Sequence, residues 1–191
     1  MFNSQGGRQD LLNLPNVLTY FRIGAVPVVL IALNPPVSPV AFHLVFFTCL
    51  FALITDYLDG ILARRKHLET SIGKLLDPLA DKLLVIAVFI MLIPLRKVPS
   101  WVVFLIVGRE LIITGLRSIA ASQGIILKAS TLGKNKMIFQ SVSMLCFVAY
   151  VPSIQRILEI TGTVFLWISL VLGYISAGFY LAHFWKHIRR C

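Results

Sequence analysis

Six predominantly apolar stretches, separated by short polar or proline-containing connectors, dominate the chain. They cover residues 16–34, 38–63, 73–95, 100–122, 135–152 and 157–184. A helix needs about 20 mainly apolar residues to cross the hydrocarbon core of a bilayer. The pattern predicts an all-α, polytopic membrane protein with six transmembrane helices. We expect a single transmembrane domain over 1–191, with a polar juxtamembrane segment at 1–12.

The composition supports lipid as the surrounding medium. Hydrophobic residues make up 58% of the 191 residues and charged residues only 14%, whereas soluble domains average about 45–50% and about 25%. A net charge of +10 would suggest nucleic acid for a soluble chain, but here no basic helix stands apart from the apolar stretches. We therefore expect membrane lipids as partners and no nucleic acid.

Lysine and arginine are distributed unevenly between alternate connectors. On the side of the N-terminus lie Arg64, Arg65, Lys66, Lys74, Lys128, Lys134, Lys136, Lys186, Arg189 and Arg190. On the opposite side lie only Arg96, Lys97 and Arg156. Because cytoplasmic loops collect Lys and Arg, both termini are predicted to be cytoplasmic.

Four of the eight acidic residues occur at the inner ends of the second and third stretches. Asp56 and Asp59 are three apart and Asp77 and Asp81 are four apart, so each pair shares one helix face. The short connector between the two helices favours antiparallel packing, which would bring all four carboxylates to one pocket. Oxygen ligands without His or Cys suit Mg²⁺ or Mn²⁺. The alternatives are four separate ion pairs with Arg or Lys, or a cation path across the membrane.

Small residues accompany these acids. Gly60 and Ala63 lie on the Asp56 side of the second helix, and Gly73 lies on the third. Small side chains leave room for a ligand to approach the backbone. The alternative is close helix packing.

Basic residues follow on the same side of the membrane. Arg109 and Arg117 are eight apart on one helix, and Lys134 and Lys136 begin the next. Guanidinium groups suit a phosphate dianion, so a phosphate-bearing second substrate is expected to bind there. Two alternatives stay open: Arg109 pairs with Glu110 or the acidic cluster, and the lysines only mark the cytoplasmic side.

The acidic segment matches a known pattern at all eight fixed positions. These are Asp56, Asp59, Gly60, Ala63, Arg64, Gly73, Asp77 and Asp81. The spacing resembles the D-x2-D-G-x2-A-R-x8-G-x3-D-x3-D signature of the CDP-alcohol phosphatidyltransferase family.

Other segments resemble the phosphatidylglycerophosphate synthases of that family. They are Asn13–Arg22, Gly108–Glu110, Thr114–Arg117 and Leu132–Lys136, although relatives are expected to carry Thr or Ser near Met137. For Arg22, contact with the substrate diphosphate and contact with lipid head groups are both open.

The resemblance implies a homodimer in the bacterial inner membrane, with a polar cavity open to the cytoplasm. It implies that the hydroxyl of sn-glycerol 3-phosphate attacks the β-phosphorus of CDP-diacylglycerol, and CMP leaves. Serine, inositol phosphate and phosphatidylglycerol are alternative acceptors. In this sequence Asp56, Asp59 and Asp77 would hold metal, with Asp81 as a further ligand or the general base.

The same resemblance assigns the nucleotide side to Asp56, Gly60, Ala63, Arg64 and Gly73. The acceptor phosphate would meet Arg109, Arg117, Lys134 and Lys136. Two divalent ions are expected, because a two-metal site stabilises both the attacking and the leaving oxygen.

Overall fold

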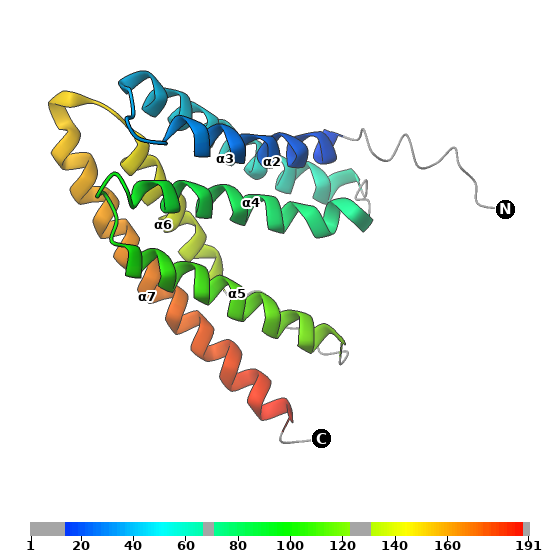
Figure 1. The fold of residues 1–191 in the computed structure, drawn as a ribbon. Coiled ribbons are helices and arrows are strands. Elements are labelled where there is room, and N and C mark those ends of the chain that lie inside the picture. The colour runs from blue at the N-terminus through cyan, green and yellow to red at the C-terminus, as the bar shows by residue number, and fades with distance from the viewer. Residues whose placement is uncertain (1–13, 67–70, 123–130, 189–191) are drawn as a thin grey trace. The chain divides into compact units, whose positions relative to one another are not determined.

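The computed structural model describes residues 14–66, 71–122 and 131–188, and within these ranges the protein is helical without strands. Figure 1 shows the helices in chain order. They are α2 (Leu14–Ala32), α3 (Pro39–Lys66), α4 (Ser71–Leu92), α5 (Ser100–Ser122), α6 (Thr131–Val148) and α7 (Gln155–Ile188). A short 3₁₀ turn, Pro152–Ile154, precedes α7. The predicted all-α class is confirmed for the described part of the chain.

Each of the six apolar stretches falls on one helix. The stretch 100–122 coincides with α5. By contrast, α6 begins at Thr131 rather than 135, and α7 runs past 184 to Ile188. Hydropathy marks only the apolar part of a helix, whereas the backbone hydrogen bonding continues into polar turns.

Two segments are long and apolar enough to cross a membrane. They are Pro39–Asp56, which lies in α3, and Pro152–Ala182, which contains most of α7. The apolar parts found in α2 and α4 are shorter, Thr19–Ala32 and Lys82–Leu92. Six crossings therefore remain a prediction.

The chain divides into two compact units. The first runs to Leu95 and includes Val148–Tyr150. In it, α2 packs against both α3 and α4. The core of this unit contains buried aliphatic side chains from all three helices and from the turn after α2, among them Val29, Leu33, Val45, Val88 and Leu92. Through this packing, α2 contacts both helices that carry the family signature.

The second unit contains α5, α6 and α7. Helix α5 packs against α7. Between α6 and α7, the Ser143 hydroxyl donates to the Gly162 carbonyl at 2.7 Å. A Cβ at Gly162 would lie 3.2 Å from the Cβ of Cys146, so the lack of a side chain allows the close approach of these helices.

An ion pair joins the start of the second unit to its last helix. Lys97 Nζ lies 3.4 Å from the carboxylate of Glu159 and donates to the Phe147 carbonyl at 2.9 Å. Lys97 thus binds the last turn of α6, where a cation interacts favourably with the helix dipole, and the first turns of α7.

Large apolar side chains remain on the outside of the helices. The most exposed include Ile31, Val40, Phe104 and Leu111. An extensive exposed apolar surface is costly in water, whereas hydrocarbon accommodates it.

Candidate functional site

The eight signature positions lie on two helices. Asp56, Asp59, Gly60, Ala63 and Arg64 belong to α3, and Gly73, Asp77 and Asp81 belong to α4. The side chain of Asp56 is described. The side chains at the other seven positions, Asp59, Gly60, Ala63, Arg64, Gly73, Asp77 and Asp81, lie outside the described part, and their convergence stays a prediction.

Arg22 of α2 contacts the first aspartate of the signature. Its side chain is fully buried, and its Nη1 lies 3.2 Å from Oδ1 of Asp56 on α3. The Asp56 side chain keeps 42% of its surface exposed, so the ion pair does not enclose the carboxylate. The sequence had suggested diphosphate or lipid head groups as the contact of Arg22. The general cost of an intramembrane charge was the signal that a carboxylate partner should exist.

The donor chemistry of the signature fits a hard divalent cation. The one described carboxylate of the four, Asp56, is accessible, and all four predicted ligands offer only oxygen, as Mg²⁺ prefers. Among the described side chains, no group of three or more His, Cys, Asp or Glu residues lies close enough to hold a metal. The side chains of Asp59, Asp77 and Asp81 are not among them.

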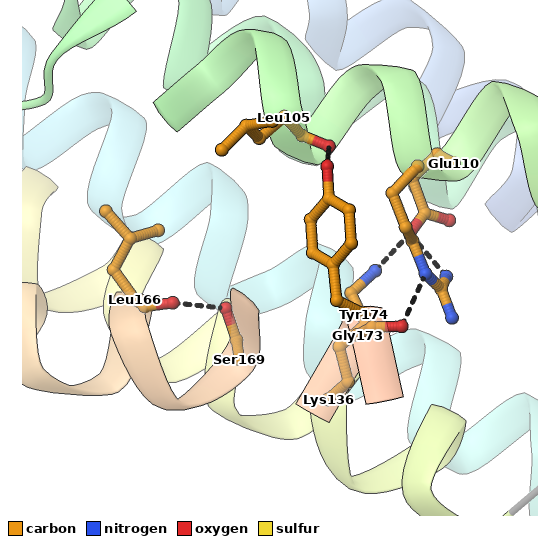
Figure 2. A network of polar contacts seen from close by, with 8 residues as sticks. Leu105, Glu110, Lys136, Leu166, Ser169, Gly173 and Tyr174 are labelled. Atoms are coloured by element: carbon orange, nitrogen blue, oxygen red, sulfur yellow. Dashed lines mark hydrogen bonds and ion pairs between the residues drawn. The ribbon is translucent and has the colours of Figure 1, made fainter. Parts of the chain in front are cut away.

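A second polar cluster lies inside the second unit, where three helices meet. Arg109 Nη1 on α5 lies 2.7 Å from Oε1 of its neighbour Glu110, and Arg109 Nε donates to the Gly173 carbonyl of α7 at 3.2 Å. Lys136 Nζ, from α6, contacts the same Oε1 of Glu110 (Figure 2). Arg109, Glu110 and Lys136 are all buried.

Further polar contacts surround this cluster. The Tyr174 hydroxyl donates to the Leu105 carbonyl at 3.2 Å, and the Ser169 hydroxyl donates to the Leu166 carbonyl at 2.8 Å (Figure 2). Arg109, Glu110 and Lys136 share a small pocket with residues that include Gln140, Ser169, Gly173 and Tyr174.

The four predicted acceptor-binding residues therefore fall into two pairs. The structure brings Arg109 and Lys136 together on one carboxylate. Arg117 on α5 and Lys134 on α6 are exposed. The sequence had suggested Glu110 only as an alternative partner of Arg109. Its contact with Lys136, 26 residues further along, depends on the tertiary structure that brings these two side chains together, which no local pattern specifies.

The first unit carries the aspartate signature on apolar helices, and the second unit holds the buried polar cluster of Arg109, Glu110 and Lys136. These features define a helical, membrane-associated class of protein. The chain belongs to the CDP-alcohol phosphatidyltransferase family, whose sequence model matches residues 12–175. The resemblance found in the signature is confirmed.

The curated relatives agree with the family match. The chain is 39% identical over 171 residues to a CDP-diacylglycerol–glycerol-3-phosphate 3-phosphatidyltransferase of Rickettsia bellii, covering 88% of this chain and 93% of the relative. It is 32% identical over 190 residues to a Bacillus subtilis protein of the same name, covering 94% and 98%. A Wigglesworthia glossinidia protein of that name is 33% identical over 186 residues, covering 94% and 98%. The chain is a phosphatidyltransferase of a membrane-associated lipid biosynthesis family.

Proposed function

We propose that this protein transfers the phosphatidyl group of CDP-diacylglycerol to sn-glycerol 3-phosphate. The acceptor hydroxyl oxygen bonds to the β-phosphorus, and the bond from that phosphorus to the bridging oxygen breaks. Phosphatidylglycerophosphate forms and CMP leaves with the bridging oxygen. The observation that supports this most is the complete eight-position signature in a chain whose relatives, similar over nearly their full length, carry the matching name.

We assign the metal site to the four aspartates Asp56, Asp59, Asp77 and Asp81. One or two Mg²⁺ or Mn²⁺ ions held there would neutralise the diphosphate and stabilise the attacking and leaving oxygens. Asp81 is assigned as the residue that accepts the acceptor hydroxyl proton, a contribution of roughly 10²–10⁴-fold for general-base catalysis. Arg22 orients Asp56 through their ion pair.

The nucleotide side is assigned to the small residues of the signature and its arginine. Gly60, Ala63 and Gly73 leave space beside Asp56 for the cytidine diphosphate, and Arg64 supplies a cation. These roles follow from the resemblance of the signature and from the size of the side chains.

The acceptor phosphate is assigned to the basic residues of the second unit, Arg109, Arg117, Lys134 and Lys136. Two of them, Arg109 and Lys136, already share one buried site. Arginine forms charge-assisted hydrogen bonds with phosphate, and an acceptor without a phosphate would not require several cations.

We further propose six membrane crossings in the bacterial inner membrane, with both termini and the reaction site on the cytoplasmic face, and a homodimer. The charge distribution among the connectors supports the orientation. The dimer rests on the family resemblance alone.

The test is CMP release by the purified enzyme in detergent with CDP-diacylglycerol and Mg²⁺. Glycerol 3-phosphate, serine, inositol phosphate and phosphatidylglycerol are supplied in turn. We expect release only with glycerol 3-phosphate, and a loss of roughly 10²–10⁴-fold in kcat in Asp81→Asn. Turnover with another acceptor would overturn the acceptor assignment. No turnover with any of them, in folded protein, would overturn the reaction.

A further inference from the structure

Glu110 connects cations from two helices through one oxygen atom. Oε1 of Glu110 contacts Nη1 of Arg109 on α5 and Nζ of Lys136 on α6. The third helix of the unit takes part through the Gly173 carbonyl, which accepts from Arg109 Nε. The two cations are therefore held by acceptors from α5 and α7.

This arrangement leaves donors of Arg109 available. Its Nε and Nη1 are engaged, but within the described part of the chain Nη2 has no hydrogen-bond partner. A guanidinium carries five N–H donors in a rigid plane. Fixing it at two nitrogens orients the remaining N–H groups before any ligand arrives, which reduces the ordering cost of binding.

We propose that Glu110 is a positioning residue for the acceptor phosphate, a role that rests on the proposed function of Arg109 and Lys136. Glu110 holds both cations in one geometry and makes no contact with substrate itself. Gly173 lies beside both cations: a Cβ there would make ordinary contacts, 3.5 Å from Cγ of Lys136 and 3.7 Å from Nε of Arg109, so alanine fits. A larger side chain would compete with both for space.

Positioning and charge balance predict opposite effects of removing the carboxylate. The net formal charge of Arg109, Lys136 and Glu110 together is +1, and it becomes +2 in Glu110→Gln. If the carboxylate only offset positive charge, the added charge would tighten phosphate binding. If it positions the cations, its loss weakens binding, because a misplacement of about 1 Å in such a site can cost on the order of 10²-fold.

The experiment measures the KM for glycerol 3-phosphate and the KM for CDP-diacylglycerol separately in Glu110→Gln. We expect the acceptor KM to rise roughly tenfold to hundredfold, with the KM for CDP-diacylglycerol unchanged. Glu110→Asp, which keeps the charge on a shorter stem, should show a smaller rise. A lower acceptor KM in Glu110→Gln would overturn positioning in favour of charge balance. Two unchanged KM values with a lower melting temperature would leave Glu110 purely structural.

Two further variants keep the proposal testable if Glu110→Gln fails to fold. Gly173→Val adds bulk beside Lys136 and Arg109 without touching the carboxylate, and it should raise the acceptor KM more than Gly173→Ala does. Equal acceptor KM values in Gly173→Val and Gly173→Ala would contradict the proposed positioning of Arg109 and Lys136. The matched control is Glu159→Gln, which removes a carboxylate paired with Lys97 in the same unit and should leave both KM values unchanged.

The wild-type enzyme separates this proposal from the proposed function. If it accepts a different alcohol, the assignment of glycerol 3-phosphate fails. The same KM comparison with the true acceptor then still tests Glu110.

Discussion

The guanidinium of Arg22 and the carboxylate of Asp56 form an ion pair across the α2–α3 contact, with Nη1 and Oδ1 3.2 Å apart. Arg22 is fully buried, whereas Asp56 is partly open. The signature aspartate is thus held from its buried side and accessible on the other. This geometry makes Arg22 a structural support for the signature, although it lies 34 residues before Asp56 in the chain.

Replacing Arg22 by Gln should reduce both stability and turnover. Because the ion pair is partly exposed, the cost of losing it should lie between that of a surface pair and that of a buried pair. We expect the free energy of unfolding to fall by about 1–3 kcal/mol. Thermal unfolding in detergent and CMP release measure the two effects. Arg156→Gln is the control, since Arg156 is exposed at the start of α7. Equal changes in stability and turnover in Arg22→Gln and Arg156→Gln would rule out the supporting role of Arg22.

Removal of divalent cations should abolish turnover. With EDTA we expect no CMP release, and addition of Mg²⁺ or Mn²⁺ should restore it, because the signature offers only carboxylate oxygens as ligands. Full activity in EDTA-treated protein, with residual metal excluded by elemental analysis, would contradict the metal assignment.

Lys134 and Lys136 should differ in their effect on stability. Lys136 is buried against Glu110, whereas Lys134 is exposed. Lys136→Met leaves the buried carboxylate with one partner fewer and should destabilise by about 1–3 kcal/mol. Lys134→Met should stay within about 0.5 kcal/mol of wild type. The free energy of unfolding in detergent compares the two, and an equal loss would contradict the buried contact.

Lys97 and Glu159 should be energetically coupled. A double-mutant cycle with Lys97→Met and Glu159→Gln isolates their interaction, for which we expect about 0.5–1 kcal/mol. Lys97→Met alone should cost more than this, because it also loses the bond to the Phe147 carbonyl. KM values should stay at the wild-type level. A coupling of zero would mean that the pair contributes nothing to stability.

The two ends of α5 should lie on opposite sides of the membrane. Ser100 and Ser122 are both exposed and bound this helix, whose 23 residues span about 34 Å at 1.5 Å per residue. In a background without Cys49, Cys146 and Cys191, an impermeant maleimide should label Ser100→Cys in intact cells. It should label Ser122→Cys only after permeabilisation, and the reverse pattern would invert the proposed topology.

Apolar stretches predicted the helices well, because a helix that is to cross hydrocarbon needs a run of about 20 mainly apolar residues. The run at 100–122 coincides with α5 even though Arg109 and Glu110 interrupt it. Pairings between helices were not predictable in the same way. Nothing near Arg22 in the sequence indicates Asp56, and nothing near Glu110 indicates Lys136. These contacts depend on which helix faces pack together. That choice is set by the fit of side chains between the helices, which cannot be read from a single sequence.

For the candidate site, residue spacing predicted which helices carry the signature, while the convergence of its side chains stays a prediction. The eight signature positions fall on α3 and α4 as expected. The residues proposed for the acceptor phosphate were chosen by charge, and their role stays a prediction. Charge does not distinguish a buried lysine from an exposed one two residues away. Lys136 is buried and contacts Glu110 of α5, whereas Lys134 is exposed.

If α5 and α6 cross the bilayer as proposed, the contact between Glu110 and Lys136 also bears on how they insert during synthesis. A charged residue at the centre of an inserting helix costs roughly 2.5–3.5 kcal/mol. Arg109 and Glu110 lie near the middle of α5, and Lys136 lies near the start of α6. These helices follow one another in the chain, so an ion pair between them can form as soon as both have been made. If both helices cross the bilayer as proposed, they would insert together as a hairpin, with Glu110 of α5 offset by Lys136 of α6 as well as by its neighbour Arg109.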